Sequence, residues 1–323
     1  VSLYLLIYFN MNWQSRILGT CFMSIVQFLI LTYFALKNNW ISFQFSKNII
    51  KRSLIFSIPL IPNIAAGWIA GFSDRIIMTF YGRLGEAGIY SVAASFTMLL
   101  YILNDAVTQV QGPLSLSGLT ENKKDAKIEM QNFLIVFVGT MSVFYLGLSL
   151  FSKEILTIST DNQYHIAHKL ISILGPIYIF SGVYRIFTVL ITFHGMTWWI
   201  SVAAIFQALV NILLNLIFIP VFGMYAAAYS TLISMFLYTC FIVWRVQLID
   251  PLIIHYRLIS KILFLIVFIT VMKSLVYFYI SLLFVQIIIK LALFLFSIVT
   301  IYLILIRNSM ISDDYNIWLI NRK

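Results

Sequence analysis

Long apolar runs separated by short polar connections fill most of this chain. An α-helix rises about 1.5 Å per residue and the hydrocarbon layer is about 30 Å thick, so about 20 apolar residues span it. Membrane-barrel strands would alternate apolar and polar positions, so the pattern predicts an all-α polytopic membrane protein. About nine runs predict full transmembrane helices, after an apolar stub at residues 1–10: 17–36, 53–81, 88–112, 130–151, 170–193, 197–219, 223–244, 262–280 and 283–306.

The polar connections are short. The longest are residues 114–129, 152–169 and 245–261, and none is long enough for a catalytic domain outside the membrane. Residues 37–52 combine Trp40, Phe43 and Phe45 with Lys47 and Lys51, a pattern typical of a helix that lies in the membrane interface.

The run at residues 53–81 is unusual. Its roughly 29 residues would make a helix about 43 Å long, and Pro59 and Pro62 predict a kink or a tilt. The run contains Asp74 and Arg75, and charges inside a bilayer normally face protein or water. Two interpretations stay open, a packed seam with an internal ion pair or a cavity wall of a transporter. Small and polar residues share one helical face: Asn63, Gly67, Ala70, Gly71, Asp74 and Tyr81.

Three further runs carry polar faces at helical spacing. They consist of Ser91, Ser95, Tyr101, Asp105 and Thr108 in one run, of Tyr178, Ser181, Arg185, Thr188 and Thr192 in another, and of Gln207, Asn211 and Asn215 in the third. Continuous polar faces on several helices favour a shared aqueous cavity over a dry polar core. Lys273 and Lys290 also lie inside runs, and we expect both to reach an interface or a lipid headgroup.

Lys and Arg are distributed unevenly between the two sides of the membrane. Consecutive connections alternate sides, and one side receives the connections 37–52, 114–129, 194–196 and 245–261 and the tail from Arg307. Of the 21 basic residues, thirteen fall on that side, four on the other and four within runs. The positive-inside rule therefore predicts that the C-terminus and the first side are cytoplasmic. The net charge of +10 reports this topology and contact with anionic lipid, and we expect no nucleic-acid partner.

Composition agrees with a membrane location and indicates no cofactor. The chain is 62% hydrophobic and 10% charged with a mean hydropathy of +0.98, whereas soluble domains are about 25% charged. Cys21 and Cys240 lie in apolar runs and predict no disulfide, and His165 and His168 lack partners for a metal site. No Gly-x-x-x-x-Gly-Lys-Ser/Thr run is present, so we expect no nucleotide, no metal and no catalytic residue.

Three segments resemble a known family of transporters. IPLIPNIAAGWIAGFSDRIIMTFYGRLGEAGIYSVA at residues 58–93 is similar to the seventh and eighth helices of Wzx-type O-antigen and polysaccharide repeat-unit flippases. LVNILLNLIFIPVFGMYAAAYSTLIS at 209–234 resembles their eleventh and twelfth helices, and NWQSRILGTCFMS at 12–24 resembles the entry to their sixth. These flippases belong to the multidrug/oligosaccharidyl-lipid/polysaccharide exporter superfamily. The resemblance implies fourteen helices, in two lobes of six plus two more.

The resemblance also implies domain boundaries. Residues 1–36 would end the N-terminal lobe, with part of helix five and helix six, and 37–52 would be a cytoplasmic interfacial linker. The C-terminal lobe would occupy 53–244, followed by a cytoplasmic linker at 245–261, two additional helices at 262–306 and a cytoplasmic tail at 307–323. The first residue is Val, and the family's first four helices and most of its fifth have no counterpart, so a fragment, a gene-calling error and a real truncation stay open as explanations.

The leading hypothesis is ion-coupled flipping of an undecaprenyl-diphosphate-linked oligosaccharide across the bacterial inner membrane. A diphosphate requires cations, and the candidates are Arg75 and Arg185. Asp74 and Asp105 are the candidates for ion coupling. Gln207, Asn211, Asn215 and Tyr101 are expected to line the cavity. Membrane lipids are expected partners, as are a polysaccharide polymerase and a chain-length regulator. A membrane enzyme of the same pathway and a small-molecule exporter of the same superfamily remain alternatives.

Overall fold

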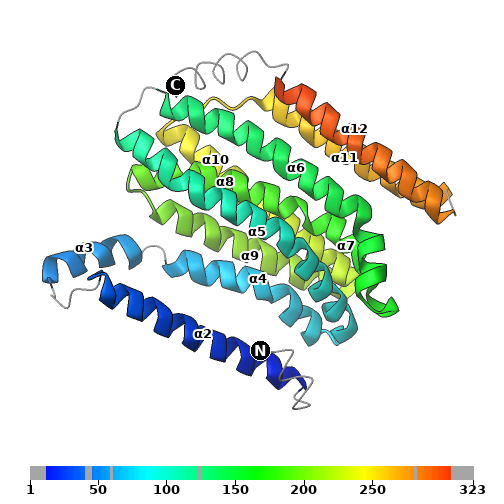
Figure 1. Cartoon of the computed structure of the whole chain (residues 1–323), viewed down its shortest axis with the longest axis horizontal. Helices are drawn as coiled ribbons and strands as arrows, with labels where there is room; N and C mark the ends of the chain where they lie inside the picture. The colour runs from blue at the N-terminus through cyan, green and yellow to red at the C-terminus, as the bar shows by residue number, and fades with distance from the viewer. Residues whose placement is uncertain (1–11, 41–45, 59–60, 122–124, 280–281, 307–323) are drawn as a thin grey trace. The chain divides into compact units, whose positions relative to one another are not determined.

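Figure 1 shows the computed structural model of the chain, which describes residues 12–40, 46–58, 61–121, 125–279 and 282–306. The elements in these ranges are all helical, as the sequence predicts. The predicted stub at 1–10 and tail at 307–323 lie outside the described residues. The elements are α2 (Asn12–Lys37), α3 (Lys47–Ser57), α4 (Ile61–Phe80), α5 (Leu84–Thr120), α6 (Ala126–Ser159), the 3₁₀ turn η2 (Asn162–Tyr164), α7 (Ala167–Leu174), α8 (Pro176–Phe193), α9 (Trp198–Phe222), α10 (Met224–Ile249), α11 (Tyr256–Tyr279) and α12 (Leu283–Ile306).

Eight helical segments within the described ranges are long and apolar enough to cross a membrane. The predicted total of about nine differs by one helix, α4. Its 20 residues correspond to about 30 Å, which is long enough for the hydrocarbon layer. Asn63, Ser73, Asp74 and Arg75 interrupt its apolar sequence, and α4 is not among the eight segments. The predicted span that does not meet this criterion is therefore α4, which carries the buried carboxylate of Asp74.

Two of the predicted helices are interrupted. The expected single helix over 53–81 is wrong, because α3 ends at Ser57 and α4 begins at Ile61. The expected helix over 170–193 is divided into α7 and α8 at Gly175, since Pro176 cannot donate the backbone hydrogen bond that would continue α7.

Two other helices are longer than predicted. Helix α5 has 37 residues and α6 has 34, about 55 Å and 51 Å, so both exceed the hydrocarbon thickness. The predicted polar connection at 114–129 is therefore mostly helical. That at 152–169 is also mostly helical, with η2 near its centre. Polar residues continue a helix beyond the bilayer because propensity alone, without an apolar pattern, can sustain it.

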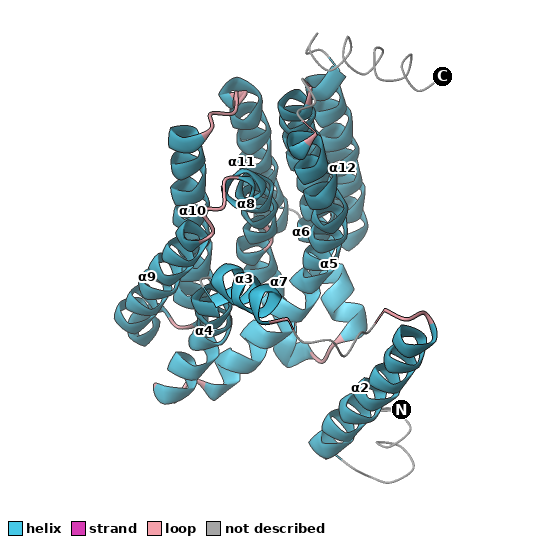
Figure 2. Ribbon diagram, turned by 90° about the vertical axis from the view of Figure 1, so that its left-hand side faces the viewer, coloured by secondary structure: helices cyan, strands magenta, loops and turns pink. Residues whose placement is uncertain are grey.

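The chain divides into two compact units, Val1–Ile55 and Phe56–Lys323. In the second unit, α9 packs against α4 and α10, and α8 packs against α5, α6 and α10. The contacts between α4, α9 and α10 use small side chains such as Ala70 and Ala227, which let helix backbones approach closely. Helices α11 and α12 pack against α6, on the far side of the bundle from α4 and α9 (Figures 1 and 2).

The first unit contains α2, of which Ile17–Lys37 qualifies as a membrane span. Large apolar side chains such as Phe22, Phe28 and Tyr33 are exposed around this helix. An apolar helix surface of this kind suits contact with lipid or with another helix.

Candidate functional site

The carboxylate of Asp74 lies inside the helix bundle and is only 2% exposed. The Tyr90 hydroxyl on α5 donates to its Oδ2 at 2.5 Å, and the Thr231 hydroxyl on α10 donates to the same oxygen at 2.8 Å. The Asn215 amide on α9 donates to Oδ1 at 2.6 Å. Hydrogen bonds from three neighbouring helices thus satisfy a carboxylate that has no cationic partner among the described residues.

A second layer of polar contacts surrounds this carboxylate. Asn211 accepts a hydrogen bond from Ser73 at 2.7 Å and another from Asn215 at 3.1 Å. The Asn211 amide also donates to Thr231 at 3.3 Å. Asn211 and Asn215 are fully buried, so the side chains predicted to line a cavity are shielded from solvent in this conformation. Their role as cavity residues stays a prediction.

Sequence reasoning missed Tyr90 and Thr231 as members of this cluster. A signal existed in each helix. Tyr90, Thr97 and Asn104 recur every seven residues on the buried face of α5. Thr231 lies next to the buried Ser230 and three residues before the buried Ser234. Polar residues with this spacing on a buried face indicate hydrogen bonding between helices.

Arg75 does not pair with Asp74, as expected for adjacent residues whose side chains point about 100° apart on a helix. Its Nε donates to the Ser91 hydroxyl at 2.9 Å, and its guanidinium donates to the Gly71 carbonyl at 3.0 Å. The guanidinium carbon also lies 5.5 Å from the ring centroid of Tyr90. A Cβ at Gly71 would meet no atom within 4 Å, and the Arg75 side chain is partly buried.

Arg185 on α8 pairs with Asp105 on α5 at 2.6 Å and donates to the Thr108 hydroxyl at 3.2 Å. Its guanidinium carbon lies 5.8 Å from the ring centroid of Tyr101. Asp105 also accepts a hydrogen bond from Gln109 at 2.5 Å. The carboxylate partner of Arg185 in this structure is therefore Asp105. Arg185 lines a groove of about 380 Å³ together with Thr108, Gln109, Gly112, Leu116, Thr188, Val189 and Thr192.

The two arginines contact the same side of α5 at different positions along the helix axis. Arg75 bonds to Ser91 and Arg185 bonds to Asp105, fourteen residues later in one continuous helix. This separation corresponds to about 21 Å along the helix and to a rotation of only about 40°. One phosphate group cannot contact both arginines at once in this conformation.

The remaining predicted residues lie between these two sites or beside them. The ring of Tyr101 contacts that of Tyr178 with centroids 6.1 Å apart, next to Arg185. Gln207 is 9% exposed, and its amide approaches the sulfur of Met235 at 4.0 Å. Gln207 therefore lies one turn from Asn211 but outside the network around Asp74.

Lys273 and Lys290 contradict the expectation that they reach an interface. Lys290 is fully buried, pairs with Glu154 on α6 and donates a hydrogen bond to the Tyr277 hydroxyl at 2.9 Å. Lys273 is 5% exposed and donates to the Ser149 carbonyl at 2.5 Å and to the Ser172 hydroxyl at 2.7 Å. Both ammonium groups find protein acceptors, so neither has to extend to water. These contacts fix α11 and α12 to α6 and α7.

A charged cluster joins three helix ends elsewhere in the bundle. Asp250, just after α10, pairs with Lys127 on α6 and lies 3.2 Å from Nε2 of His194 after α8. Burial raises the pKa of the Asp250 carboxyl, but hydrogen bonds from Lys127 and His194 outweigh it and hold that pKa below its usual value.

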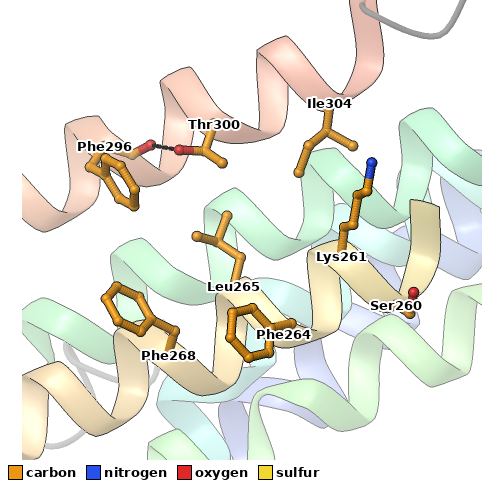
Figure 3. A pocket seen from close by; sticks show the side chains of 8 residues that line it. All are labelled: Ser260, Lys261, Phe264, Leu265, Phe268, Phe296, Thr300 and Ile304. Carbon is orange, nitrogen blue, oxygen red and sulfur yellow. Dashed lines mark hydrogen bonds between the residues drawn. The ribbon is translucent and has the colours of Figure 1, made fainter. Parts of the chain in front are cut away.

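An apolar groove of about 710 Å³ lies between α11 and α12 (Figure 3). Phe264, Phe268 and Phe296 line it, and Lys261 stands towards one end. This surface suits contact with hydrocarbon chains. Within the described residues no group of three His, Cys, Asp or Glu side chains could hold a metal ion.

Comparison with known proteins defines the fold. No protein-family model matches the chain, and no curated protein matches it. A solved structure of the lipid II flippase MurJ in an inward closed conformation matches with a TM-score of 0.59 and 19% sequence identity. The match covers 85% of this chain and 59% of that one, so the chain spans less than two thirds of the flippase. The chain therefore has the helical fold of a multi-pass membrane transporter, and the similarity is one of fold.

Proposed function

We propose that this chain takes part in flipping a lipid-linked glycan across a membrane, and that its substrate is an undecaprenyl-diphosphate-linked oligosaccharide repeat unit. A glycan is too polar to cross hydrocarbon without a hydrated passage. The fold shared with a lipid II flippase supports the class of substrate. Two arginines along the same side of α5 carry the proposal, because guanidinium groups bind phosphate oxygens in pairs.

The separation of the arginines suggests that they act in succession. A diphosphate is much shorter than the distance of about 21 Å between their contacts on α5. With the topology favoured by the basic connections, Arg185 lies nearer the cytoplasmic end of α5 and Arg75 nearer the opposite end. The diphosphate would replace Asp105 at Arg185 first and would meet Arg75 after the transporter changes conformation.

Asp74 is the better of the two candidates for ion coupling. Asp105 already has a cationic partner, whereas Asp74 has neutral donors only. A proton or a monovalent cation bound at Asp74 would neutralise a buried charge and rearrange contacts among α4, α5, α9 and α10. Alternating access driven by an ion gradient follows from such a coupling.

The proposed setting is the bacterial inner membrane, with the C-terminus cytoplasmic and residues 53–244 as the C-terminal lobe. Residues 262–306 would be the two additional helices, and a polymerase and a chain-length regulator would use the exported O-antigen or exopolysaccharide unit.

Binding of undecaprenyl diphosphate to the purified chain, measured by native mass spectrometry, tests the proposal. Replacing Arg185 by Gln is expected to weaken binding by about tenfold to a hundredfold, the usual value of a hydrogen bond to a charged group. Arg75→Gln is expected to weaken it less, because the diphosphate meets Arg75 only after the change of conformation. Arg257→Gln removes an equal charge from an exposed position and is expected to leave binding unchanged. Equal binding of undecaprenol and undecaprenyl diphosphate would contradict a site for phosphate.

A further inference from the structure

Tyr90 contacts both the candidate coupling carboxylate and a candidate phosphate-binding arginine. Its side chain is 3% exposed, and its hydroxyl donates to Asp74 at 2.5 Å. The guanidinium carbon of Arg75 lies 5.5 Å from the centroid of the same ring, within the range of a cation–π interaction. Asp74 and Arg75 point in different directions from one helix, and the ring of Tyr90 is a side chain that contacts both of them.

We propose that Tyr90 is a positioning residue that links ion occupancy at Asp74 to the placement of the Arg75 guanidinium. The inference rests on the proposed function, in which Asp74 binds the coupling ion and Arg75 meets the substrate phosphate.

Occupation of Asp74 changes what the Tyr90 hydroxyl can bond to. A proton or a cation on the carboxylate competes with the hydroxyl for Oδ2. The hydroxyl has an alternative partner in Thr231, whose oxygen already lies 3.4 Å away. At 3.4 Å this contact is longer than an optimal O–H···O hydrogen bond, so a full hydrogen bond to Thr231 would draw the hydroxyl oxygen and its ring toward α10.

Arg75 is free to follow such a movement. Within the described residues it contacts Ser91, the Gly71 carbonyl and the rings of Phe72 and Tyr90, none of them a carboxylate. The guanidinium is therefore held by neutral contacts alone, each of them weaker than an ion pair with a carboxylate. A small displacement of the ring is enough to change which direction the guanidinium favours.

Few other side chains around Asp74 could carry a change at its carboxylate to Arg75. Asn211 and Asn215 face it from α9, Thr231 from α10 and Tyr90 from α5. Apart from Arg75 on its own helix, Tyr90 is the titratable side chain among them. The other three are neutral, and none of them is among the hydrogen-bond or ring partners of Arg75 within the described ranges. A coupled change at Arg75 therefore has to pass through Tyr90 or through the backbone of α4.

Chemical modification of Arg75 tests this link without any substrate. Phenylglyoxal reacts with guanidinium groups, and peptide mass spectrometry gives the rate at Arg75 relative to Arg185 in the same sample. We expect this ratio to change by about tenfold when the ion that saturates Asp74 is varied, either protons or sodium. Tyr90→Phe keeps the ring over Arg75 but lacks the hydroxyl, so the ratio should no longer respond to the ion.

Two controls separate this effect from damage to the fold. Tyr145→Phe removes another buried hydroxyl, which donates to the Ser172 carbonyl far from Asp74, and the ratio should still respond. Asp74→Asn should abolish the response in the presence of Tyr90. A wild-type response in Tyr90→Phe would overturn the inference, as would the lack of any response in the wild-type chain.

The same samples distinguish this inference from the proposed function. If the ratio responds to the ion through Tyr90 while undecaprenyl diphosphate does not bind, the link stands and the proposed substrate is wrong. If undecaprenyl diphosphate binds through Arg75 with no response to the ion, the substrate stands and the link is wrong.

Discussion

The ion pair between Arg185 and Asp105 makes a prediction that separates structural pairing from substrate binding. The perturbation is a double-mutant cycle with Arg185→Gln, Asp105→Asn and both changes together. The two side chains are 27% and 25% exposed and 2.6 Å apart, so they are intermediate between a surface pair and a buried pair. Surface pairs contribute about 0–1 kcal/mol and hydrogen bonds to charged groups about 1.5–3 kcal/mol, so we expect a coupling energy of about 1–2 kcal/mol.

Unfolding of the four proteins in mixed detergent micelles gives this coupling energy. Each single change should lower the free energy of unfolding, and the double change should cost less than the sum of the two single changes. Strict additivity would show that the contact does not stabilise the protein, and the reasoning about its geometry would be refuted.

Binding of undecaprenyl diphosphate to the same four proteins should follow a different pattern. Asp105→Asn releases Arg185 from a competing carboxylate, so binding should become equal or tighter. Arg185→Gln should bind weakly whether or not Asp105 is also changed. Restored binding in the double variant would show that Arg185 serves structure alone.

Three further predictions concern other parts of the fold. Gly223 has φ of +59°, and a Cβ there would lie 1.9 Å from a carboxylate oxygen of Glu86. Gly223→Ala should therefore lower the free energy of unfolding by about 1–3 kcal/mol, whereas the control Gly85→Ala, with open space around it, should not. Lys290→Ala leaves the carboxylate of Glu154 unpaired and should lower the free energy of unfolding by about 3–5 kcal/mol in an unfolding titration. Adding Glu154→Gln to this variant should recover part of that loss. The pKa of Asp250 is depressed in the folded state, so its contribution to stability is present above about pH 3.9 and is lost as the pH falls through the folded-state pKa. The difference in melting temperature between wild type and Asp250→Asn should therefore shrink as the pH is lowered below about 3.9.

Much of the fold follows from the sequence because the bilayer imposes a simple pattern. Apolar length alone located the spans that became α2, α9, α10, α11 and α12 to within a few residues at most ends. The same rule failed at α7 and α8, where a proline breaks a helix inside one continuous apolar run. It also failed at the ends of α5 and α6, because helices that leave the bilayer carry no apolar signal.

The candidate site was only partly visible in the sequence. Helical spacing identified Asp74, Asn211 and Asn215 as polar residues on inward faces, and the structure brings these three together. Spacing within one helix cannot report which helix lies opposite, so the pairing of Arg185 with Asp105 and the contacts of Tyr90 required the fold. The buried position of Lys290 was missed for the same reason, since its partner Glu154 belongs to a distant part of the chain.

The most direct test of the central claim is the movement of a lipid-linked glycan between membrane leaflets. Cells that lack their own flippase for the glycan would express the gene for this protein, and an impermeant lectin would report the glycan that reaches the outer face of spheroplasts. The proposal predicts lectin binding with the wild-type gene and little with Arg75→Gln or Arg185→Gln at matched protein level, while Arg257→Gln behaves as wild type. Equal lectin binding with and without the wild-type gene, or with both arginine variants, would contradict it.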